Sequence, residues 1–187
     1  MENYIVYLIP AIGIIALIFT AIRAAWIRNQ SSGTEKMVRI AGYISDGAMA
    51  FIKAEFKILA VFVVSVAVLL AVATGTENSS PLVALSFVMG AISSGLAGFI
   101  GLRIATRANV RTTHAARNSL NDALKVAFAG GSVMGLAVVG LGILGLSVLF
   151  ILYANLFGAS DIQSLNKVLT VLTGFSFGAS SIALFSR

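Results

Sequence analysis

The chain contains no cysteine and only one histidine, His114, among its 187 residues. The lack of cysteine excludes disulfides and thiol chemistry. A single histidine has no partner with which to build a metal site, so His114 is expected to be a solvated loop residue. The seven Asp and Glu residues are too scattered to form a metal cluster or a general acid–base pair. The sequence therefore predicts no catalytic residue, cofactor-binding residue or metal ligand within this chain.

Charge is also scarce, at 11% of residues, and it is missing from five long runs. These uncharged runs occupy positions 3–22, 58–76, 78–102, 126–160 and 168–186. A helix needs about 20 residues to cross the hydrocarbon core of a bilayer, which is roughly 30 Å thick, and each run is about that long or longer. A charged side chain at mid-bilayer costs about 2.5–3.5 kcal/mol on the insertion scale, so five such runs indicate an integral membrane protein.

Strand-like patterning is absent as well. The chain is 58% hydrophobic, with a mean hydropathy of +0.98, and its apolar runs are continuous rather than alternating. Continuous runs argue against an outer-membrane barrel. Helices then remain as the structure that satisfies every backbone group in lipid. The predicted fold class is an all-α membrane protein with five transmembrane helices.

What charge there is has an uneven sign and placement. Of the thirteen Lys and Arg residues, six lie in 23–57 and five in 103–125, and the formal net charge is +6. Such clustering is typical of cytoplasmic junctions between membrane helices. No aromatic platform is interleaved with the basic residues, which argues against nucleic-acid binding. The first run lacks a basic stretch before it, so we expect no cleaved signal peptide and an N-terminus outside the cell.

The charge pattern divides the chain into segments of a single membrane domain, residues 1–187. Because the N-terminus is placed outside, five crossings leave the C-terminus on the cytoplasmic side. An amphipathic cytoplasmic helix is expected just before the second crossing, with which it is continuous. The expected membrane helices are 4–27, 58–74, 81–107, 126–153 and 168–186, and the amphipathic helix covers 37–57.

Glycine is concentrated in the last three expected membrane helices, which hold twelve of the eighteen glycines, whereas 58–74 holds none. Small residues four apart allow helix backbones to approach closely in lipid. We therefore expect the last three helices to be packed in protein and the first two to face lipid; general glycine enrichment of membrane helices is the alternative. The small-residue sets are Gly90/Ser94/Gly98, Gly131/Gly135 and Gly174/Gly178.

The segment Gly140–Gly145 matches the dinucleotide fingerprint GxGxxG. That fingerprint requires a strand before it and an exposed helix N-terminus after it. Here it lies within an uncharged run that is long enough to span the bilayer. We interpret these glycines as sites of close helix packing.

Three arginines, Arg103, Arg107 and Arg111, recur every four residues and share one helix side. Contact with anionic lipid headgroups and control of topology explain them adequately. The alternative is that they attract an anionic substrate toward the cytoplasmic face.

The last run carries a stripe of hydroxyl groups. Thr173, Ser176, Ser180 and Arg187 fall within roughly 60° of one another on a helical wheel. They are candidates for lining a polar pathway. The alternative is that the hydroxyls bond neighbouring helices while Arg187 reaches the interface.

Three stretches together resemble the membrane-integral, ion-pumping inorganic pyrophosphatases. They are ISDGAMAFIKAEFK at 44–57, the long stretch that begins ATRANVRTT at 105 and ends GLS at 147, and TGFSFGASSIALFSR at 173–187. The likeness covers nearly the whole chain in the same order. It implies that the chain is the N-terminal portion of a larger bundle with two concentric rings of helices, in which the first four helices are outer and the fifth is inner.

The resemblance also implies a function. Members of the family hydrolyse cytoplasmic pyrophosphate with Mg²⁺ and move protons, sodium ions or both outward, some with K⁺ as activator. A multi-pass location in a prokaryotic inner membrane, contact with membrane lipids and a homodimer follow from it. Arg187 matches an arginine of the ion pathway that pairs with acidic residues on other inner helices. The family's Mg²⁺ and pyrophosphate ligands follow the position of Arg187, so this chain alone is expected to be inactive.

Two other classes of function use the same features. A helical subunit of a secondary transporter or channel would also need small-residue helices and a polar stripe, without any hydrolysis. A purely structural membrane subunit would insert stably and support a partner without chemistry.

Overall fold

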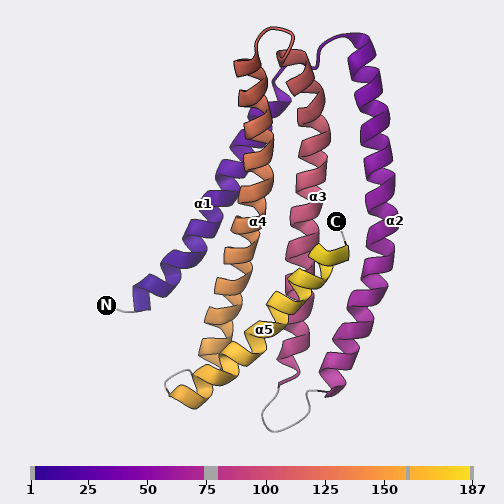
Figure 1. The fold of residues 1–187 in the computed structure, drawn as a ribbon. Helices are drawn as coiled ribbons and strands as arrows, with labels where there is room; N and C mark the ends of the chain where they lie inside the picture. Colours follow the sequence, from indigo (N-terminus) through magenta and orange to yellow (C-terminus); the bar gives the residue numbers. More distant parts are fainter. Residues whose placement is uncertain (1–2, 74–79, 159–160, 186–187) are drawn as a thin grey trace.

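The computed structural model describes residues 3–73, 80–158 and 161–185, and within them every regular element is a helix. All five helices are long and apolar enough to cross a membrane, which confirms the predicted all-α membrane fold. The chain runs up and down between the two ends of the bundle (Figure 1). The helices are α1 (Asn3–Arg28), α2 (Glu35–Ala73), α3 (Leu82–Ala115), α4 (Leu120–Phe157) and α5 (Ile162–Phe185).

Several helices extend beyond their apolar segments. Helix α2 contains both the segment expected to be amphipathic and the second crossing, up to Ala73; position 74 lies outside the described residues. With 39 residues it is about 58 Å long at 1.5 Å per residue. Helices α3 and α4 likewise continue past the expected 81–107 and 126–153. These three helices are therefore longer than a hydrocarbon core is thick.

The connection between α3 and α4 is short, and the helix that follows it is capped. Helix α4 begins after Ser119, whose side chain accepts a hydrogen bond from the backbone N–H of Asp122 at 3.1 Å. The Ser119 hydroxyl in turn donates to the Asp122 carboxylate at 2.8 Å. This exchange satisfies orphan groups in the first turn of the helix and fixes where it starts. Helix α4 ends at Gly158, which has a left-handed backbone with φ of 62°.

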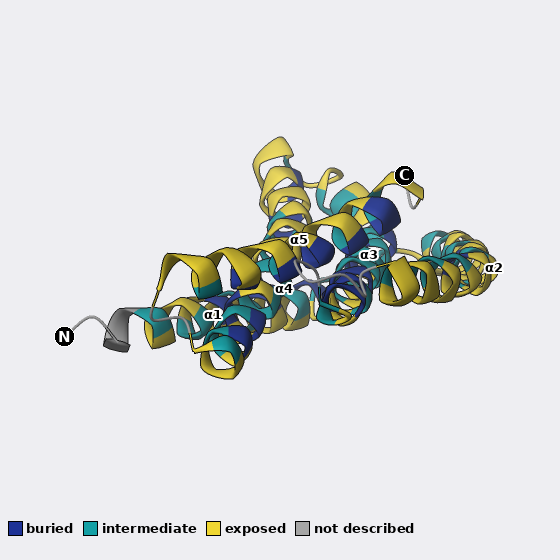
Figure 2. Ribbon diagram, turned by 90° about the horizontal axis from the view of Figure 1, so that it is seen from below, coloured by how far each residue is buried: buried dark blue, intermediate teal, exposed yellow. Residues whose placement is uncertain are grey.

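Four helices form a layer in the order α1, α4, α3, α2, and α5 lies across one face of it (Figure 2). Helix α3 is central because it contacts every other helix. Helices α1 and α2 are neighbours in sequence, yet they make no contact among the described residues. Both basic connections, α1 to α2 and α3 to α4, lie at the same end of the bundle (Figure 1).

Burial differs sharply between helices. In the most apolar 18-residue window, 39% of the residues are buried in α3 and in α5, and 22% in α4, against 11% in α1 and 6% in α2. The last three helices are thus more closely packed within this chain than the first two, as expected; that α1 and α2 face lipid stays a prediction. The best-buried cluster joins α3, α4 and α5, and its members are Val83, Leu149, Tyr153, Val168, Val171 and Phe175.

Two of the three glycines of the GxGxxG match, Gly140 and Gly145, serve helix packing as interpreted from the sequence, whereas Gly142 has nothing within 4 Å among the described residues. They lie in the interior of α4, with helix on both sides and no strand before them. A Cβ on Gly140 would lie 3.2 Å from the carbonyl oxygen of Gly13 in α1, and one on Gly145 would crowd the ring of Phe175 in α5. The segment therefore receives two neighbouring helices and shows no nucleotide-binding geometry.

Candidate functional site

The helix that carries the hydroxyl stripe has two faces of different character. One face of α5 holds Gly174 and Gly178, both buried against α3. A Cβ on Gly174 would overlap the carbonyl oxygen of Val83, and one on Gly178 would overlap that of Phe87. Gly90 of α3 makes the reciprocal approach to the backbone of Phe175. Here the two backbones touch, which allows Cα–H···O contacts and requires residues without side chains.

The opposite face of α5 presents the predicted stripe. Thr173, Ser176 and Ser180 are all exposed. Thr173 donates its hydroxyl to the carbonyl oxygen of Thr170 at 2.7 Å, whereas the hydroxyls of Ser176 and Ser180 find no partner within the described residues. Ser181 differs from them: it is buried and donates to the carbonyl oxygen of Phe177 at 2.8 Å. The structure thus keeps the three stripe residues together on a face that this chain leaves uncovered.

Arg187 is the fourth predicted member of the stripe, and it lies outside the described residues. Its place in the sequence is two positions after the end of α5 at Phe185.

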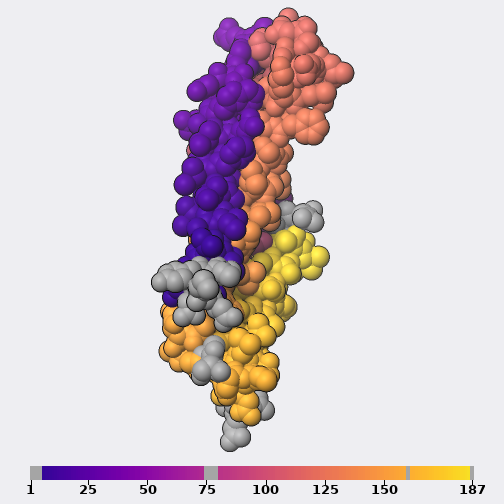
Figure 3. Space-filling model, turned by 90° about the vertical axis from the view of Figure 1, so that its left-hand side faces the viewer, coloured from indigo at the N-terminus to yellow at the C-terminus, as the bar shows by residue number. Residues whose placement is uncertain are grey.

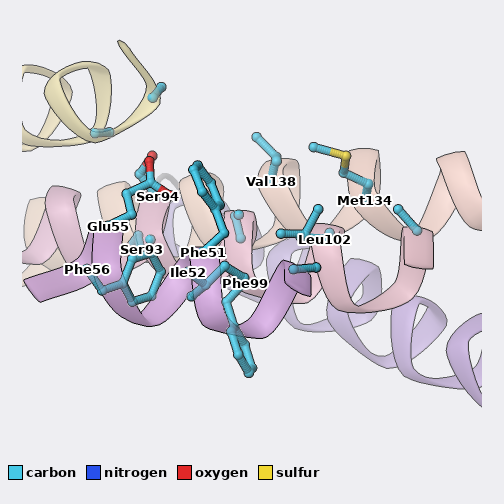
Figure 4. A pocket seen from close by; sticks show the side chains of 18 of the residues that line it. Phe51, Ile52, Glu55, Phe56, Ser93, Ser94, Phe99, Leu102, Met134 and Val138 are labelled. Atoms are coloured by element: carbon cyan, nitrogen blue, oxygen red, sulfur yellow. The ribbon is translucent and has the colours of Figure 1, made fainter. Parts of the chain in front are cut away.

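A cavity of about 730 Å³ lies among α2, α3, α4 and α5. Ser180 is the stripe residue that lines it. Figure 4 shows that the rest of the wall is mostly aromatic and aliphatic, with a polar patch where α2 meets α3. The polar side chains are Glu55, Ser93, Ser94 and Ser180, and the large apolar ones include Phe51, Phe56, Phe99, Phe175 and Met134.

Glu55 is the one carboxylate in this wall, and no role was predicted for it from the sequence. Its Oε1 is shielded from solvent and has no hydrogen-bond partner in the described part of the chain. The inward face of α2 carries Glu55 together with the buried Ile52 and Leu59. Other apolar residues of the same segment, Ile40, Ile44 and Phe51, are 47%, 54% and 59% exposed. Glu55 lies three positions after Ile52 and four before Leu59, so helical spacing places it on the same side as these two buried residues.

The prediction that His114 is a solvated loop residue needs correction. His114 lies in the last turn of α3 rather than in a loop, and its Nδ1 is buried without a partner among the described residues. A Cβ on Gly33 would lie 2.9 Å from that nitrogen, so the α1–α2 connection covers the imidazole. No three His, Asp or Glu side chains gather anywhere in the described ranges.

Arg111 has a structural role that its two neighbours in the series lack. Its guanidinium donates to the carbonyl oxygens of Gln30 at 3.1 Å, Arg28 at 3.2 Å and Arg107 at 2.9 Å. These bonds tie the end of α1 to α3, since the last carbonyls of a helix have no partner of their own. Arg103 instead lies over the Phe99 ring, 5.8 Å from its centroid.

Comparison with known proteins identifies the origin of this arrangement. The family model described as inorganic H+ pyrophosphatase matches residues 14–187. A protein of Clostridium tetani, provisionally named a K(+)-stimulated pyrophosphate-energized sodium pump, is 48% identical over the whole chain and 25% of its own length. K(+)-insensitive pyrophosphate-energized proton pumps of Moorella thermoacetica and Methanosarcina mazei are each 40% identical, over 96% and 98% of this chain and 25% of their own lengths.

The chain spans about a quarter of the length of these relatives. Its match to the family model begins near the middle of α1 and continues through the glycine face and hydroxyl stripe of α5. The helices that position the candidate site are therefore the ones on which the match rests, and the chain belongs to the inorganic H+ pyrophosphatase family.

Proposed function

We propose that this chain is the N-terminal part of a primary pump that couples hydrolysis of cytoplasmic pyrophosphate to outward transport of protons, sodium ions or both. Membership of the family supports the proposal, as do relatives whose names specify pyrophosphate-energized pumps. In this view α1 to α4 are scaffold helices of an outer ring, and α5 is an inner helix that lines the ion pathway. The chain by itself is expected to be inactive.

The observation that carries the role of α5 is the contrast between its two faces. The glycine face is fixed on α3 by backbone contact, which sets the rotation of the helix. Thr173 and Ser176 are then exposed on the side of the helix away from this contact, and Ser180 is exposed at its edge, where it lines the cavity among α2, α3, α4 and α5. Hydroxyls left facing lipid gain nothing, so their natural neighbours are further polar helices of a larger bundle.

Arg187 extends this stripe, and we propose that it stands in the ion pathway. A guanidinium inside a membrane protein needs a carboxylate partner, because leaving it unpaired costs several kcal/mol, on the order of 3–5. The proposed partners are acidic residues on other inner helices. Movement of a cation past Arg187 would then exchange one ion pair for another, which gives the pathway a gate.

The hydrolytic centre is proposed to lie in other parts of the full-length protein. The described residues offer no acidic group of three that suits Mg²⁺, so Mg²⁺ and pyrophosphate have no fitting site here. The name of the Clostridium tetani relative includes K⁺ stimulation, and we propose K⁺ as an activator on that basis. A homodimer in the cell membrane completes the proposal.

Pumping by the full-length protein tests the pathway role. In vesicles, Arg187→Ala, Ser176→Ala and Ser180→Ala are expected to reduce ion transport per pyrophosphate hydrolysed, with Arg187→Ala the most severe. Ser181→Ala is the matched control, because that hydroxyl lies on the buried side and serves only its own helix. Equal losses from Ser180→Ala and Ser181→Ala, or normal pumping by Arg187→Ala, would refute the role. Vesicles that transport ions without releasing phosphate would instead support a secondary transporter.

Orientation is tested separately. We propose that the N-terminus lies outside and that both basic connections face the cytosol. Because the chain has no cysteine, Ser31→Cys and Gln163→Cys each place a single thiol at opposite ends of the bundle. A membrane-impermeant maleimide added to whole cells should label the Gln163→Cys chain only. Labelling of Ser31→Cys from outside would reverse the topology.

A further inference from the structure

A second cavity, of about 720 Å³, opens between the C-terminal part of α1 and the first turns of α4. Figure 3 views the molecule from this side, where α1 in indigo lies along α4 in orange. We name this cavity the α1–α4 groove. It combines cationic, aromatic, aliphatic and amide side chains, chief among them Arg23, Trp26, Asn121, Leu124, Lys125 and Phe128.

The groove stands at the level where the apolar segments end. Arg23 is the first charged residue after the uncharged run 3–22 of α1, and Lys125 is the last before the uncharged run 126–160 of α4. Both line the same groove, so the two apolar boundaries coincide. That boundary is where lipid phosphates meet hydrocarbon. Trp26, the single tryptophan of the chain, suits the same level.

Both cations have capacity for an anionic ligand. The Arg23 guanidinium lies 5.2 Å from the centroid of the Phe19 ring, and no carboxylate among the described residues pairs with it. Lys125 approaches Asp122 at 3.3 Å, but their side chains are 61% and 51% exposed. Such an exposed pair is weak, and an ammonium has three donors, so Lys125 can bind a second anion. The groove is therefore electropositive and supplies several hydrogen-bond donors.

The groove also offers a large apolar surface. Phe128 is 74% exposed and Leu124 is 43% exposed, and both lie within one turn of Lys125. A free phosphate would bond the cations and leave this surface bare. A molecule with an anionic head and a hydrocarbon tail would use both parts. We propose that the α1–α4 groove binds an anionic phospholipid, with its phosphate between Arg23 and Lys125 and an acyl chain along Leu124 and Phe128.

The tryptophan permits a direct test on the full chain in bilayers. Brominated acyl chains quench indole fluorescence on contact, so Trp26 reports the lipid that occupies the groove. Brominated phosphatidylglycerol, diluted into phosphatidylcholine, is compared with brominated phosphatidylcholine at the same mole fraction. We expect an affinity ratio of about tenfold in favour of phosphatidylglycerol, given two cations near the surface. The ratio should fall as ionic strength rises, because salt screens the interaction.

Two double variants distinguish lipid binding in the groove from a general effect of the chain's positive charge. Arg23→Gln with Lys125→Gln should bring the ratio to about one. Arg39→Gln with Lys53→Gln is the matched control; it removes two exposed cations from α2, far from the groove, and should leave the ratio unchanged. Circular dichroism checks that each variant remains helical. If a variant does not, the salt dependence of the lipid preference, measured on the unsubstituted chain, still tests the proposal.

Three results would overturn the proposal. Equal quenching by the two lipids in the unsubstituted chain would show no preference for an anionic headgroup. Equal loss of preference in both double variants would assign it to the total charge of the chain. A shift of Trp26 emission by inorganic phosphate alone, in detergent and at submillimolar concentration, would assign the groove to a soluble anion.

Discussion

Helix α3 contacts α5 on one side and α2 on the other by different means. At the α5 contact, Gly90, Gly174 and Gly178 bring the two backbones together. At the α2 contact, side chains such as Ile52 and Leu59 form the interface, and Gly42 and Gly47 of α2 have nothing within 4 Å. Where lipid is as apolar as leucine, association must come from close packing and polar bonds rather than from exclusion of water. The α5 contact is therefore expected to be the stronger and more sharply oriented of the two.

The most severe test of this comparison is a methyl group at the crossing. Gly178→Ala places a Cβ on the carbonyl oxygen of Phe87, so the helices must separate. We expect a loss of about 1–3 kcal/mol in the free energy of unfolding, and a larger loss for Gly178→Leu. Unfolding in mixed micelles with rising dodecyl sulfate measures it. Gly42→Ala in α2 is the control and should be neutral or stabilising by about 0.5–1 kcal/mol. Similar losses from both variants would remove the distinction between the two contacts.

The tie between α3 and the end of α1 is expected to have the next largest effect. Arg111→Gln removes charged donors from the carbonyl oxygens of Gln30 and Arg28. Bonds from a charged group contribute about 1.5–3 kcal/mol when buried, and less where water reaches them, so we expect a loss of about 1–2 kcal/mol. Arg111→Lys should recover only part of it, because an ammonium lacks the planar fork. Protease sensitivity of the α1–α2 connection gives a local measurement, with the exposed Arg117→Gln as the control.

A buried hydroxyl pair sharpens the comparison further, since it lies beside the α5 crossing. The hydroxyls of Ser86 and Tyr153 lie 2.9 Å apart between α3 and α4. Ser86→Ala leaves the buried tyrosine with a 3.4 Å contact to the carbonyl oxygen of Leu82. The expected loss in unfolding free energy is about 0.5–1 kcal/mol. Ser147→Ala removes a hydroxyl that bonds only within α4 and should change stability by less; an equal change would mean that the interhelical bond contributes nothing.

The smallest effect is expected at the start of α5. Asp161 accepts a hydrogen bond from the backbone N–H of Ser164 at 3.1 Å, and hydrogen bonds from Ser164 lower the pKa of its carboxyl. A folded-state pKa below the unfolded one gives stability that is present above the unfolded value, ~3.9, and is lost as pH falls through the folded value. The stability difference between the unsubstituted chain and Asp161→Ala should therefore shrink on acidification. A difference that stays constant down to pH 2 would contradict this cap.

The sequence predicted the number and type of elements well. Lipid excludes charge from the spanning segments and requires every backbone group to be satisfied within a helix, so both features can be recognised in the sequence. It placed helix ends less well. The apolar window of α3 ends near Arg103, but the helix continues to Ala115. Residues such as Ala105 and Ala108 have high helix propensity, so the helix continues outside the apolar segment.

The packing of the glycines could be predicted only in part. Gly174 and Gly178 were expected to allow close approach and do so, whereas Gly131 and Gly135 have the same spacing and face open space within the described chain. The approach of Gly13 to Gly140 joins helices far apart in sequence, and no local pattern marks it. Spacing shows that a helix can be approached closely, and only the tertiary structure shows by what.

The candidate site, too, could be predicted from the sequence only in part. Thr173, Ser176 and Ser180 share an exposed face of α5 because helical periodicity fixes which residues lie together, and their place in a pathway stays a prediction. Glu55 was overlooked because its inward direction depends on which side of α2 meets α3. His114 was misplaced for a similar reason, since the cover provided by Gly33 comes from a distant connection.

The layer order α1, α4, α3, α2 has a consequence for biosynthesis. Because α1 and α2 do not touch, the first two spans leave the translocon without a helix to pack against. They must remain separate in the lipid until the α3–α4 hairpin emerges between them. Helix α5 then docks after them on α3 and α4, and its glycine contact is with a part of α3 about eighty positions earlier in the chain (Gly90 against Gly174 and Gly178). Nascent chains arrested at successive lengths should develop strong pulling force as α4 and then α5 emerge, and little as α2 does.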